Sequence, residues 1–365
     1  MASIDRRPNG RWRARYRTPD GRSRGRVFDR KIDAERFLTS MEHSKLTGSY
    51  VDPRAGRVTV REYWPTWSAR QQWRDSSRSS ITSLFSVHVL PLLGDRPLNS
   101  ITKGDVEAWS AALPLAGQTK RQAAQYLSRM LEGAVDDELI SKNPAHRARR
   151  PKVETEPVVP FTSEEKSALE EAAPAPFRVA LTLGLGAGLR LSEATGLTLD
   201  RVDFLRRQLV VDRQLVSPSA GVPTFGPLKT KRSYRTVPLA DAVVDALARH
   251  IEEHGTGQDG LLLRLDDDGP MRRQRFGVIW RALRKKAELP EAKFHTTRHT
   301  FASTLLSAGV PVPAVAEYLG HSPAVLLSTY AHLMPADHDR ARSAVQAAFD
   351  AEAGSLDAPV IIGAR

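Results

Sequence analysis

The sequence predicts a mainly α-helical protein with small β-sheets, an α+β fold divided into modules. Two observations favour this class. Most of the chain has apolar residues at the spacing of three to four typical of amphipathic helices, with proline and glycine between such segments. Alternating, strand-like patterns are confined to residues 11–28, 208–215 and 234–239. The length of 365 residues, at about 150 residues per domain, indicates two or three domains.

The composition is that of a basic globular protein. Lysine and arginine number 54 against 42 acidic residues, which gives a net charge of +12. The absence of cysteine excludes disulfides, thiolate metal sites and a cysteine nucleophile. The longest nearly apolar stretch, Val179–Leu189, has 11 residues, fewer than the roughly 20 of a membrane helix. No apolar segment of an export signal follows Arg6-Arg7. We therefore expect a soluble, cytoplasmic protein with a polyanionic partner, either nucleic acid or another acidic surface.

The first 30 residues hold ten arginines against three acids. Trp12, Ala14 and Tyr16 alternate with arginines at the period of a strand, residues 18–21 are a turn signal, and a helix is expected over 31–46. A disordered basic tail is the alternative, but the alternation favours a folded β-β-α module with one arginine-covered face. Such a ribbon can enter the DNA major groove or bind phosphates, here through Arg11, Arg13, Arg15, Arg17, Arg22, Arg24 and Arg26.

A helical unit is expected after a linker at 50–60. Thr59 with Glu62 and Thr102 with Asp105 have the spacing of capping boxes. Its helices are expected over 60–72, 78–89, 103–112 and 118–137. The proline-bearing polar stretch 151–160 then indicates a domain boundary.

Residues 161–350 are expected to form a larger, mostly helical unit. Thr162 and Glu165 have the spacing of a cap on its first helix. Strands are predicted over 208–215 and 234–239, with the polar segment 229–233 at the turn between them. Helices are predicted over 240–254, 271–287, 296–308, 313–319, 323–332 and 336–349.

Two motifs invite functional readings that the residues do not support. The glycine-rich segment 184–188 lacks the ending of a P-loop and the spacing of a dinucleotide fingerprint, so close helix packing explains it better. His295 and His299 have the i, i+4 spacing of a zinc-protease helix, but Thr296 stands where that motif needs glutamate. No third ligand is indicated, so we expect no metal site.

A set of residues in the second half of the chain carries a stronger signal. Arg190 is at a turn that enters a helix, and His295 and Arg298 are three residues apart at another helix start. His321, in Leu-Gly-His-Ser, comes 23 residues after Arg298, and Tyr330 comes nine residues later. In this order and spacing, over about residues 160–335, the chain resembles the tyrosine recombinase (phage-type integrase) family.

The resemblance implies a role for each of these residues. Tyr330 would be the nucleophile. Arg190 and Arg298 would bind the scissile phosphate, and His295 and His321 would support that site. Cleavage would store the phosphodiester bond as a 3′-phosphotyrosine ester, which a second strand would attack, so that neither metal, ATP nor another cofactor is required. Two fork-shaped, permanently cationic arginines suit the non-bridging oxygens of the transition state.

The remaining assignments leave alternatives open. Lys229 would be the general acid for the departing 5′ oxygen, but Lys231 lies in the same predicted turn. Thr296 and Thr297 replace the middle pair that the family usually has in its His-x-x-Arg box, a departure that affects local hydrogen bonding. Glu193 would orient Arg190 or a neighbour, or else it is an ordinary first-turn acid.

The resemblance also implies the modular organisation. Residues 1–50 would be an arm-type DNA-binding domain, 51–150 a helical core-binding domain, 151–350 the catalytic domain and 351–365 a C-terminal tail. The tail would either pack on a neighbouring protomer or fray. The expected partners are DNA with core and arm-type attachment sites, further protomers in a tetrameric synapse, and accessory DNA-bending or directionality proteins. The chain would integrate or excise a phage or another mobile element. The rival functions are a type IB-like topoisomerase and a catalytically silent DNA-binding regulator.

Overall fold

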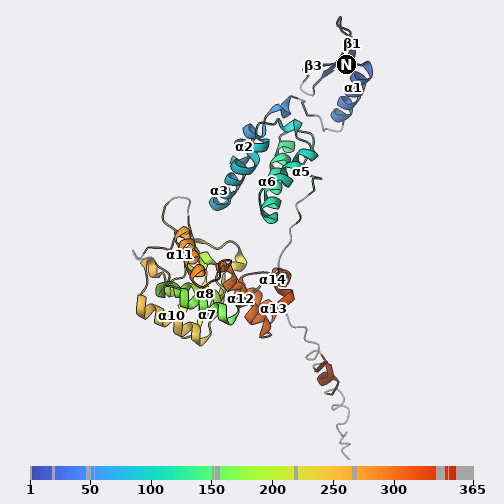
Figure 1. The fold of residues 1–365 in the computed structure, drawn as a ribbon. Helices are drawn as coiled ribbons and strands as arrows, with labels where there is room; N and C mark the ends of the chain where they lie inside the picture. Colours follow the sequence, from blue (N-terminus) through green and yellow to red (C-terminus); the bar gives the residue numbers. More distant parts are fainter. Residues whose placement is uncertain are drawn as a thin grey trace, which may run out of the picture. The chain divides into compact units, whose positions relative to one another are not determined.

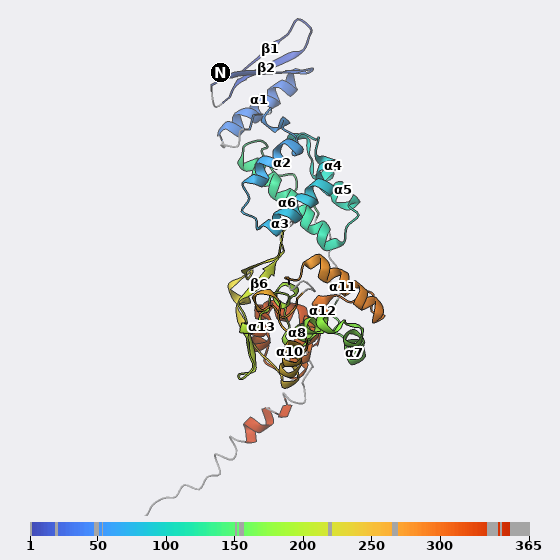
Figure 2. The ribbon, with the colours of Figure 1, turned by 90° about the vertical axis from the view of Figure 1, so that its left-hand side faces the viewer.

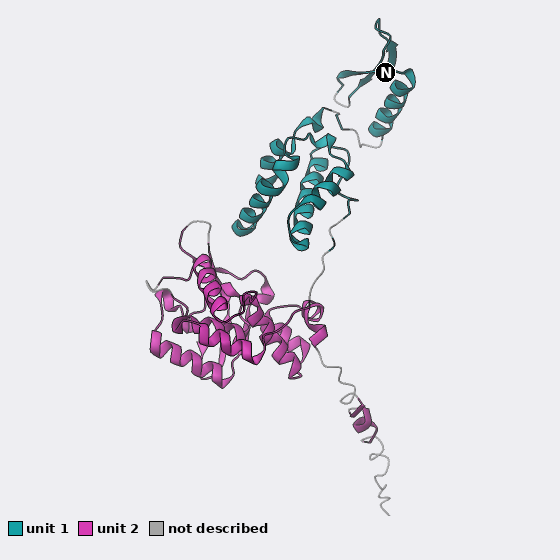
Figure 3. Cartoon of the chain, viewed as in Figure 1, with its two compact units in different colours: residues 1–155 teal, residues 156–365 magenta. Residues whose placement is uncertain are grey.

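The computed structural model describes residues 2–18, 21–46, 51–52, 54–149, 152, 157–217, 221–264, 269–333, 342–343 and 345–350. The chain divides into two compact units, residues 1–155 and 156–365 (Figures 1 and 3). Both are mainly helical with small sheets, which confirms the predicted fold class. Among the described residues, no helix is both long and apolar enough to cross a membrane. The predicted tail at 351–365 lies outside the described residues.

The N-terminal module is a three-stranded antiparallel sheet with one helix packed against it. Its elements are β1 (Ser3–Arg6), β2 (Trp12–Arg17), β3 (Ser23–Phe28) and α1 (Lys31–Leu46), and the strand order is β1-β2-β3. Ala14 and Tyr16 on β2 pack against Ala34 and Leu38 on α1 to form a small core. The predicted hairpin and helix are therefore confirmed. The additional strand β1 was not predicted, because four residues are too short to display a clear alternation.

The helical part of the first unit forms around an aromatic core. Its elements are α2 (Val60–Ala69), α3 (Asp75–Leu84) continued by a π-helical turn (Phe85–Val89), α4 (Leu90–Leu93), α5 (Lys103–Ala112) and α6 (Gly117–Asp136), with α2 and α6 in contact (Figure 2). Both predicted capping boxes are present, at Thr59 with Glu62 and at Thr102 with Asp105. Trp64 stacks on Phe85 with ring centroids 3.8 Å apart, which fixes α2 against the π-helical turn.

The second unit contains the region with the recombinase-like motifs. Its helices are α7 (Ser163–Ala172), α8 (Arg178–Ala187), α9 (Leu191–Ala194), α10 (Asp241–His254), α11 (Arg273–Lys286), α12 (Phe294–Ser307), α13 (Val312–Leu319) and α14 (Pro323–Tyr330). Its strands are β4 (Val202–Asp203), β5 (Gln208–Val211), β6 (Arg213–Val216), β7 (Thr224–Pro227) and β8 (Arg235–Pro238). The cap predicted at Thr162 and Glu165 is present.

One strand prediction is wrong. The segment 208–215 is not a single strand, because it divides at Asp212 into β5 and β6, which belong to different sheets. β5 lies between β4 and β8, whereas β6 pairs only with β7 in a separate two-stranded sheet. Since β7 was not predicted either, the hydrogen-bonding partner that separates β6 from β5 could not be anticipated.

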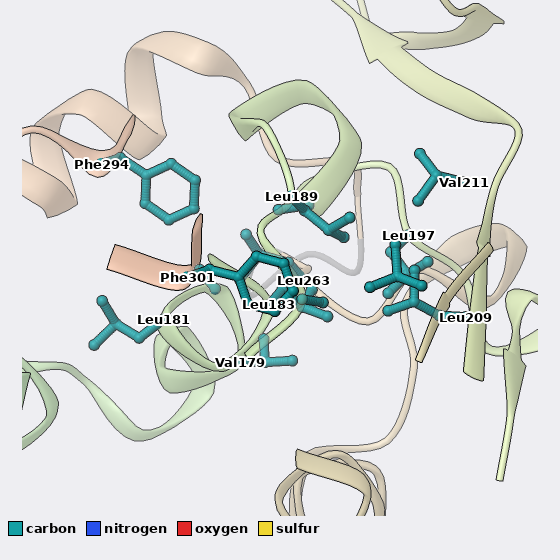
Figure 4. Close-up of a cluster of buried hydrophobic side chains, with 14 of the residues drawn as sticks. Val179, Leu181, Leu183, Leu189, Leu197, Leu209, Val211, Leu263, Phe294 and Phe301 are labelled. Carbon is teal, nitrogen blue, oxygen red and sulfur yellow. The ribbon is translucent and has the colours of Figure 1, made fainter. Parts of the chain in front are cut away.

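The core of the second unit centres on α8 and α12. Leu181, Leu183, Phe294 and Phe301 belong to this core (Figure 4). The glycines of segment 184–188 allow the close packing that was predicted for them. A Cβ on Gly184 would overlap the side chain of Thr297, and one on Gly188 would lie 2.5 Å from the Phe301 ring. Gly188 also has a φ of +62°, which ends α8 in the left-handed region.

Candidate active site

Arg190 is held at the start of α9 by a glutamate one turn later. The backbone N–H of Arg190 donates to Glu193 Oε2 at 2.9 Å, and its Nη1 donates to Glu193 Oε1 at 2.8 Å. The Arg190 side chain is 31% exposed, whereas that of Glu193 is 2% exposed. The guanidinium is therefore oriented from the protein side and accessible from the solvent side.

Glu193 is shared with a second, fully buried arginine. Arg235 Nη2 donates to Glu193 Oε2 at 2.8 Å, and Arg235 Nη1 donates to Oε1 at 3.1 Å. Burial raises the pKa of Glu193, but the hydrogen bonds and charge of Arg235, with the charge of Arg190, bring it to about 2. The carboxylate is thus ionised at neutral pH, and of the two roles considered for Glu193, orienting its neighbours is the one that these contacts favour.

Arg298 is a buried cation that no carboxylate neutralises among the described residues. Its Nη1 donates to Gly188 O at 2.6 Å, and its Nη2 donates to Leu319 O and, at 3.1 Å, to His321 Nε2. Both carbonyls belong to helix C-terminal ends, which stabilise a cation without cancelling its charge. Burial lowers the pKa of Arg298 to about 9, so the guanidinium stays charged at neutral pH and can still attract an anion.

His321 follows the glycine that ends α13. Gly320 has a φ of +62°, and the N–H of His321 donates to Ala316 O at 2.8 Å, which fixes the turn. Because His321 Nε2 accepts from Arg298, the proton of the neutral ring is on Nδ1. Burial and the charges of Arg298 and Arg190 lower the pKa of His321 to about 3. The ring therefore offers one N–H donor beside the arginines.

His295 completes the cationic cluster, by which we mean Arg190, Arg298, His295 and His321. It is exposed in the first turn of α12, and its ring centroid lies 4.6 Å from that of His299. Desolvation by surrounding protein atoms and the charges of Arg298 and Arg190 lower its pKa. The cluster thus carries its positive charge on the two arginines.

Tyr330 lies near this cluster but does not bind to it directly. The tyrosine ends α14, is 1% exposed, and donates a 2.6 Å hydrogen bond from Oη to His299 Nδ1. Burial raises the pKa of Tyr330 to about 12, against the lowering effect of the Arg298 charge. Burial, followed by the effects of His295 and then of the Arg298 charge, lowers the pKa of His299 to about 4, which keeps that ring neutral as an acceptor.

The two candidate lysines are exposed in the connection from β7 to β8. Lys229 follows β7 by two residues, and Lys231 begins a short 3-10 turn that ends at Ser233. The end of this turn lies against the α13 cap, since a Cβ on Gly320 would come within 3.0 Å of Arg232 O. The choice between the two lysines stays a prediction.

The arginines of the N-terminal module do not lie on one face, which corrects the sequence interpretation. In the pairing of β2 with β3, Arg24 is opposite Tyr16 and Arg26 is opposite Ala14, so both arginines lie on the face that packs against α1. Arg26 lies over the rings of Phe28 and Phe37 at 5.3 Å. The alternation predicts the two faces of each strand correctly, but it does not predict the register across the turn.

The other arginines of this module differ in how they are neutralised. Arg13 and Arg15 lie on the outer face, where both form ion pairs with Asp5. Arg11 pairs with Asp29 at 2.6 Å. Arg17 and Arg22 are exposed at the two strand ends next to the turn. On the outer face, Arg17 is thus exposed at the end of β2, beyond the ion pairs that Arg13 and Arg15 form with Asp5.

Sequence reasoning missed Arg235 and the part played by His299. Arg235 had a visible signal, because Ser233, Arg235, Val237 and Leu239 are the buried members of an alternating strand, and a charged residue at an inward position needs a partner. The sequence analysis considers His299 only with His295 as a possible metal pair, which gives it no part in the site. Among the described residues, no group of three or more His, Cys, Asp or Glu is arranged to hold a metal ion.

Comparisons with known proteins identify the family to which the fold belongs. The model of the phage integrase family matches residues 159–336, and that of the phage integrase N-terminal domain matches residues 2–48. The chain is 27% identical to the phiRv2 prophage integrase of Mycobacterium tuberculosis, over 89% of each chain. It is also similar to the Tn1549 transposon integrase solved with circular intermediate DNA, with 26% identity, a TM-score of 0.69, and coverage of 79% of this chain and 98% of that one. A lambda integrase tetramer bound to a Holliday junction shares the fold, with 18% identity, a TM-score of 0.56, and coverage of 87% and 95%.

The fold, with its motif order, defines a site-specific tyrosine recombinase, an enzyme that cleaves and rejoins DNA strands through a phosphotyrosine intermediate. The chain belongs to the phage integrase family and also has that family's N-terminal domain. The comparisons give no support to the rival functions, a topoisomerase or a silent regulator.

Proposed function

We propose that the cationic cluster binds the scissile phosphate of DNA and that Tyr330 is the nucleophile. The observation that carries this proposal is Arg298, a buried guanidinium whose described partners are two carbonyls and a neutral imidazole. Burying a cation without a carboxylate partner costs free energy. An anion that binds beside Arg298 would compensate for that cost. A phosphodiester fits, because its two non-bridging oxygens match the forks of Arg190 and Arg298.

The reaction then follows from the groups present. Tyr330 Oη releases its proton to solvent and forms a bond to phosphorus as the bond from phosphorus to the 5′ oxygen breaks, and Lys229 gives a proton to that oxygen. The arginines and the Nδ1–H of His321 stabilise the charge that develops on the non-bridging oxygens. The 5′-hydroxyl of another strand attacks the phosphotyrosine in the reverse sense and releases the phenol. The energy of each broken bond is kept in the ester.

The resting position of Tyr330 adds a step. Because the side chain is 1% exposed and its hydroxyl is bonded to His299, a DNA phosphate reaches Oη only after α14 shifts or the site rearranges around DNA. Cleavage is therefore coupled to DNA binding.

The modules account for DNA recognition in the proposal. Residues 1–50 bind arm-type sites through the exposed arginines near the β2–β3 turn, residues 51–150 bind the core site, and residues 151–350 perform catalysis. The N-terminal domain match and the separate small core of that module support this division. With two DNA-binding surfaces, one protomer bridges distal sites, and the linker at 50–60 sets its reach.

The assembly on DNA is proposed to be a tetrameric synapse in the bacterial cytoplasm, with accessory DNA-bending or directionality proteins, that integrates or excises a phage or other mobile element. The test is a two-site recombination assay on attachment DNA taken from the genome that flanks the gene, run beside a supercoil-relaxation assay. Exchange of flanking markers is expected. Relaxation without exchange would contradict the proposal.

A further inference from the structure

Arg235 is a buried arginine that donates hydrogen bonds to several elements around the site, although it touches no substrate position itself. It is the first residue of β8, and its side chain is 0% exposed. Beyond its two bonds to Glu193, its Nε donates to Tyr318 O at 2.7 Å and its Nη1 donates to Ser233 O at 3.0 Å. One guanidinium therefore joins three separate segments of the second unit.

Each of these segments carries an assigned group. Glu193 holds Arg190 through both its backbone and its guanidinium. Tyr318 lies one residue before Leu319, whose carbonyl binds Arg298, and three before His321. Ser233 ends the turn that contains Lys231 and follows Lys229. The positions of the phosphate-binding groups and of the lysine-bearing turn thus depend on one side chain.

The charges give Arg235 a second effect. Glu193 has two carboxylate oxygens, and Arg235 donates to both of them. Without that bidentate contact, the negative charge of Glu193 would act on Arg190 alone and reduce the attraction of Arg190 for a phosphate. With it, the three arginines Arg190, Arg235 and Arg298 outnumber the one carboxylate of Glu193, and the group carries a net charge of +2 instead of the +1 that it would have without Arg235.

We propose that Arg235 is a positioning residue for DNA cleavage, which orients Arg190 through Glu193 and anchors both the α13 end and the lysine-bearing turn through two backbone carbonyls. The inference rests on the proposed function. If the ion pair of Arg235 with Glu193 were purely structural, neutral groups could replace it with little loss of stability. Measurements of stability and of the cleavage rate therefore distinguish a structural role from a positioning role.

The experiment compares the full-length wild type with Arg235→Lys and with the double variant Glu193→Gln, Arg235→Met. Arg235→Lys keeps the charge but loses the fork, and the neutral double variant leaves no unpaired buried charge. Arg201→Lys, in half-buried ion pairs with Asp200 and Asp212, is the matched control. Thermal unfolding, DNA affinity and the single-turnover rate of covalent complex formation are measured on a nicked suicide substrate.

We expect Arg235→Lys to fold, to bind DNA within about threefold of wild type, and to form the covalent complex about 10²-fold more slowly, the scale of a small misplacement of reacting groups. A substrate with a 5′-bridging sulfur has a leaving group that needs no acid. It should raise the rate of covalent complex formation more for Arg235→Lys than for wild type, because the lysine-bearing turn of the variant has lost its anchor. The double variant is expected to behave likewise, and the Arg201→Lys control is expected to match wild type.

Cleavage within threefold of wild type by a folded Arg235→Lys protein would overturn the inference, and so would a rate loss matched by an equal loss of DNA affinity. If the single variant fails to fold, the double variant decides by the same criteria. If the wild type itself forms no covalent complex, the proposed function fails instead, so the two failures are distinguishable.

Discussion

Tyr330 Oη donates a 2.6 Å hydrogen bond to Nδ1 of His299, one helical turn beyond His295 on α12. Both side chains are largely removed from solvent, and the acceptor ring is neutral. The bond joins the residue after Arg298 to the proposed nucleophile, so it defines where the hydroxyl rests in this structure. In the proposed mechanism, this bond breaks before Tyr330 attacks the phosphate.

This relationship predicts energetic coupling between the two residues. His299→Ala leaves a buried hydroxyl without an acceptor and should lower the free energy of unfolding by about 1–3 kcal/mol. Tyr330→Phe removes the donor, so the double variant should lose less than the two single losses combined. Urea unfolding of the wild type and three variants measures the difference. Strictly additive losses would show that the hydrogen bond contributes nothing.

The buried histidines predict a loss of stability on mild acidification. The pKa values of His299, about 4, and His321, about 3, are below the ordinary value of about 6.5. Between pH 6.5 and 4 the unfolded chain therefore binds protons that the folded chain does not, and stability falls as pH falls. Glu193, with a pKa of about 2 against an ordinary value of about 4.3, adds a loss of its own mainly below about pH 4.5, where the unfolded carboxylate binds a proton and the folded one does not.

The measurement is the thermal midpoint between pH 7 and pH 4 for wild type and His299→Asn, which keeps an acceptor near Nδ1 but does not titrate. The variant should lose less stability over this range than wild type. Identical pH dependence in both would contradict the lowered pKa of His299.

The lysine assignment predicts a chemical rescue. Lys229→Ala should slow covalent complex formation by about 10²–10⁴-fold, the range for a general acid, with unchanged DNA affinity. A 5′-bridging sulfur should restore the rate, because a thiolate leaves without protonation. Lys231→Ala is the control and should change little. The reverse pattern, with rescue only of Lys231→Ala, would reassign the acid.

The N-terminal module predicts separable DNA binding. Deleting residues 1–50 should abolish binding to distal sites. It should also reduce the salt dependence of the DNA binding that remains, because the deleted arginines no longer release counterions from DNA. Cleavage at the core site should survive, since the small core of Ala14, Tyr16, Ala34 and Leu38 is separate. Salt titrations and core-site trapping measure the two effects. Loss of core cleavage as well would refute the modular account.

Within that module, Arg17→Ala and Arg26→Ala are a matched pair. Arg17 is exposed at the end of β2, so its loss should lower the salt slope by about one. Arg26 packs over two phenylalanine rings, so its loss should mainly destabilise the module.

Local signals in the sequence predicted much of the fold. The capping boxes, the helix over 31–46 and the glycine packing of 184–188 depend on spacing within a few residues, and the structure has all of them. Long-range pairing could not be predicted. The division at Asp212 depends on β7, and the face of Arg26 depends on the register across a turn.

The same distinction applies to the site. The linear order of Arg190, His295, Arg298, His321 and Tyr330 could be recognised, and four of them gather in the cationic cluster. The contact of Glu193 with Arg235, 42 residues away, exists only in the folded chain. The buried state of Tyr330 is likewise a result of packing against α12, which no local motif encodes.

The most direct test of the central claim is covalent trapping on a nicked suicide substrate with wild type and Tyr330→Phe. The wild type should form a DNA adduct that maps to the peptide with Tyr330, whereas Tyr330→Phe should bind the same DNA with comparable affinity and form none. An adduct of undiminished yield from Tyr330→Phe, or no adduct from active wild type, would contradict the assignment of this phenol as the nucleophile.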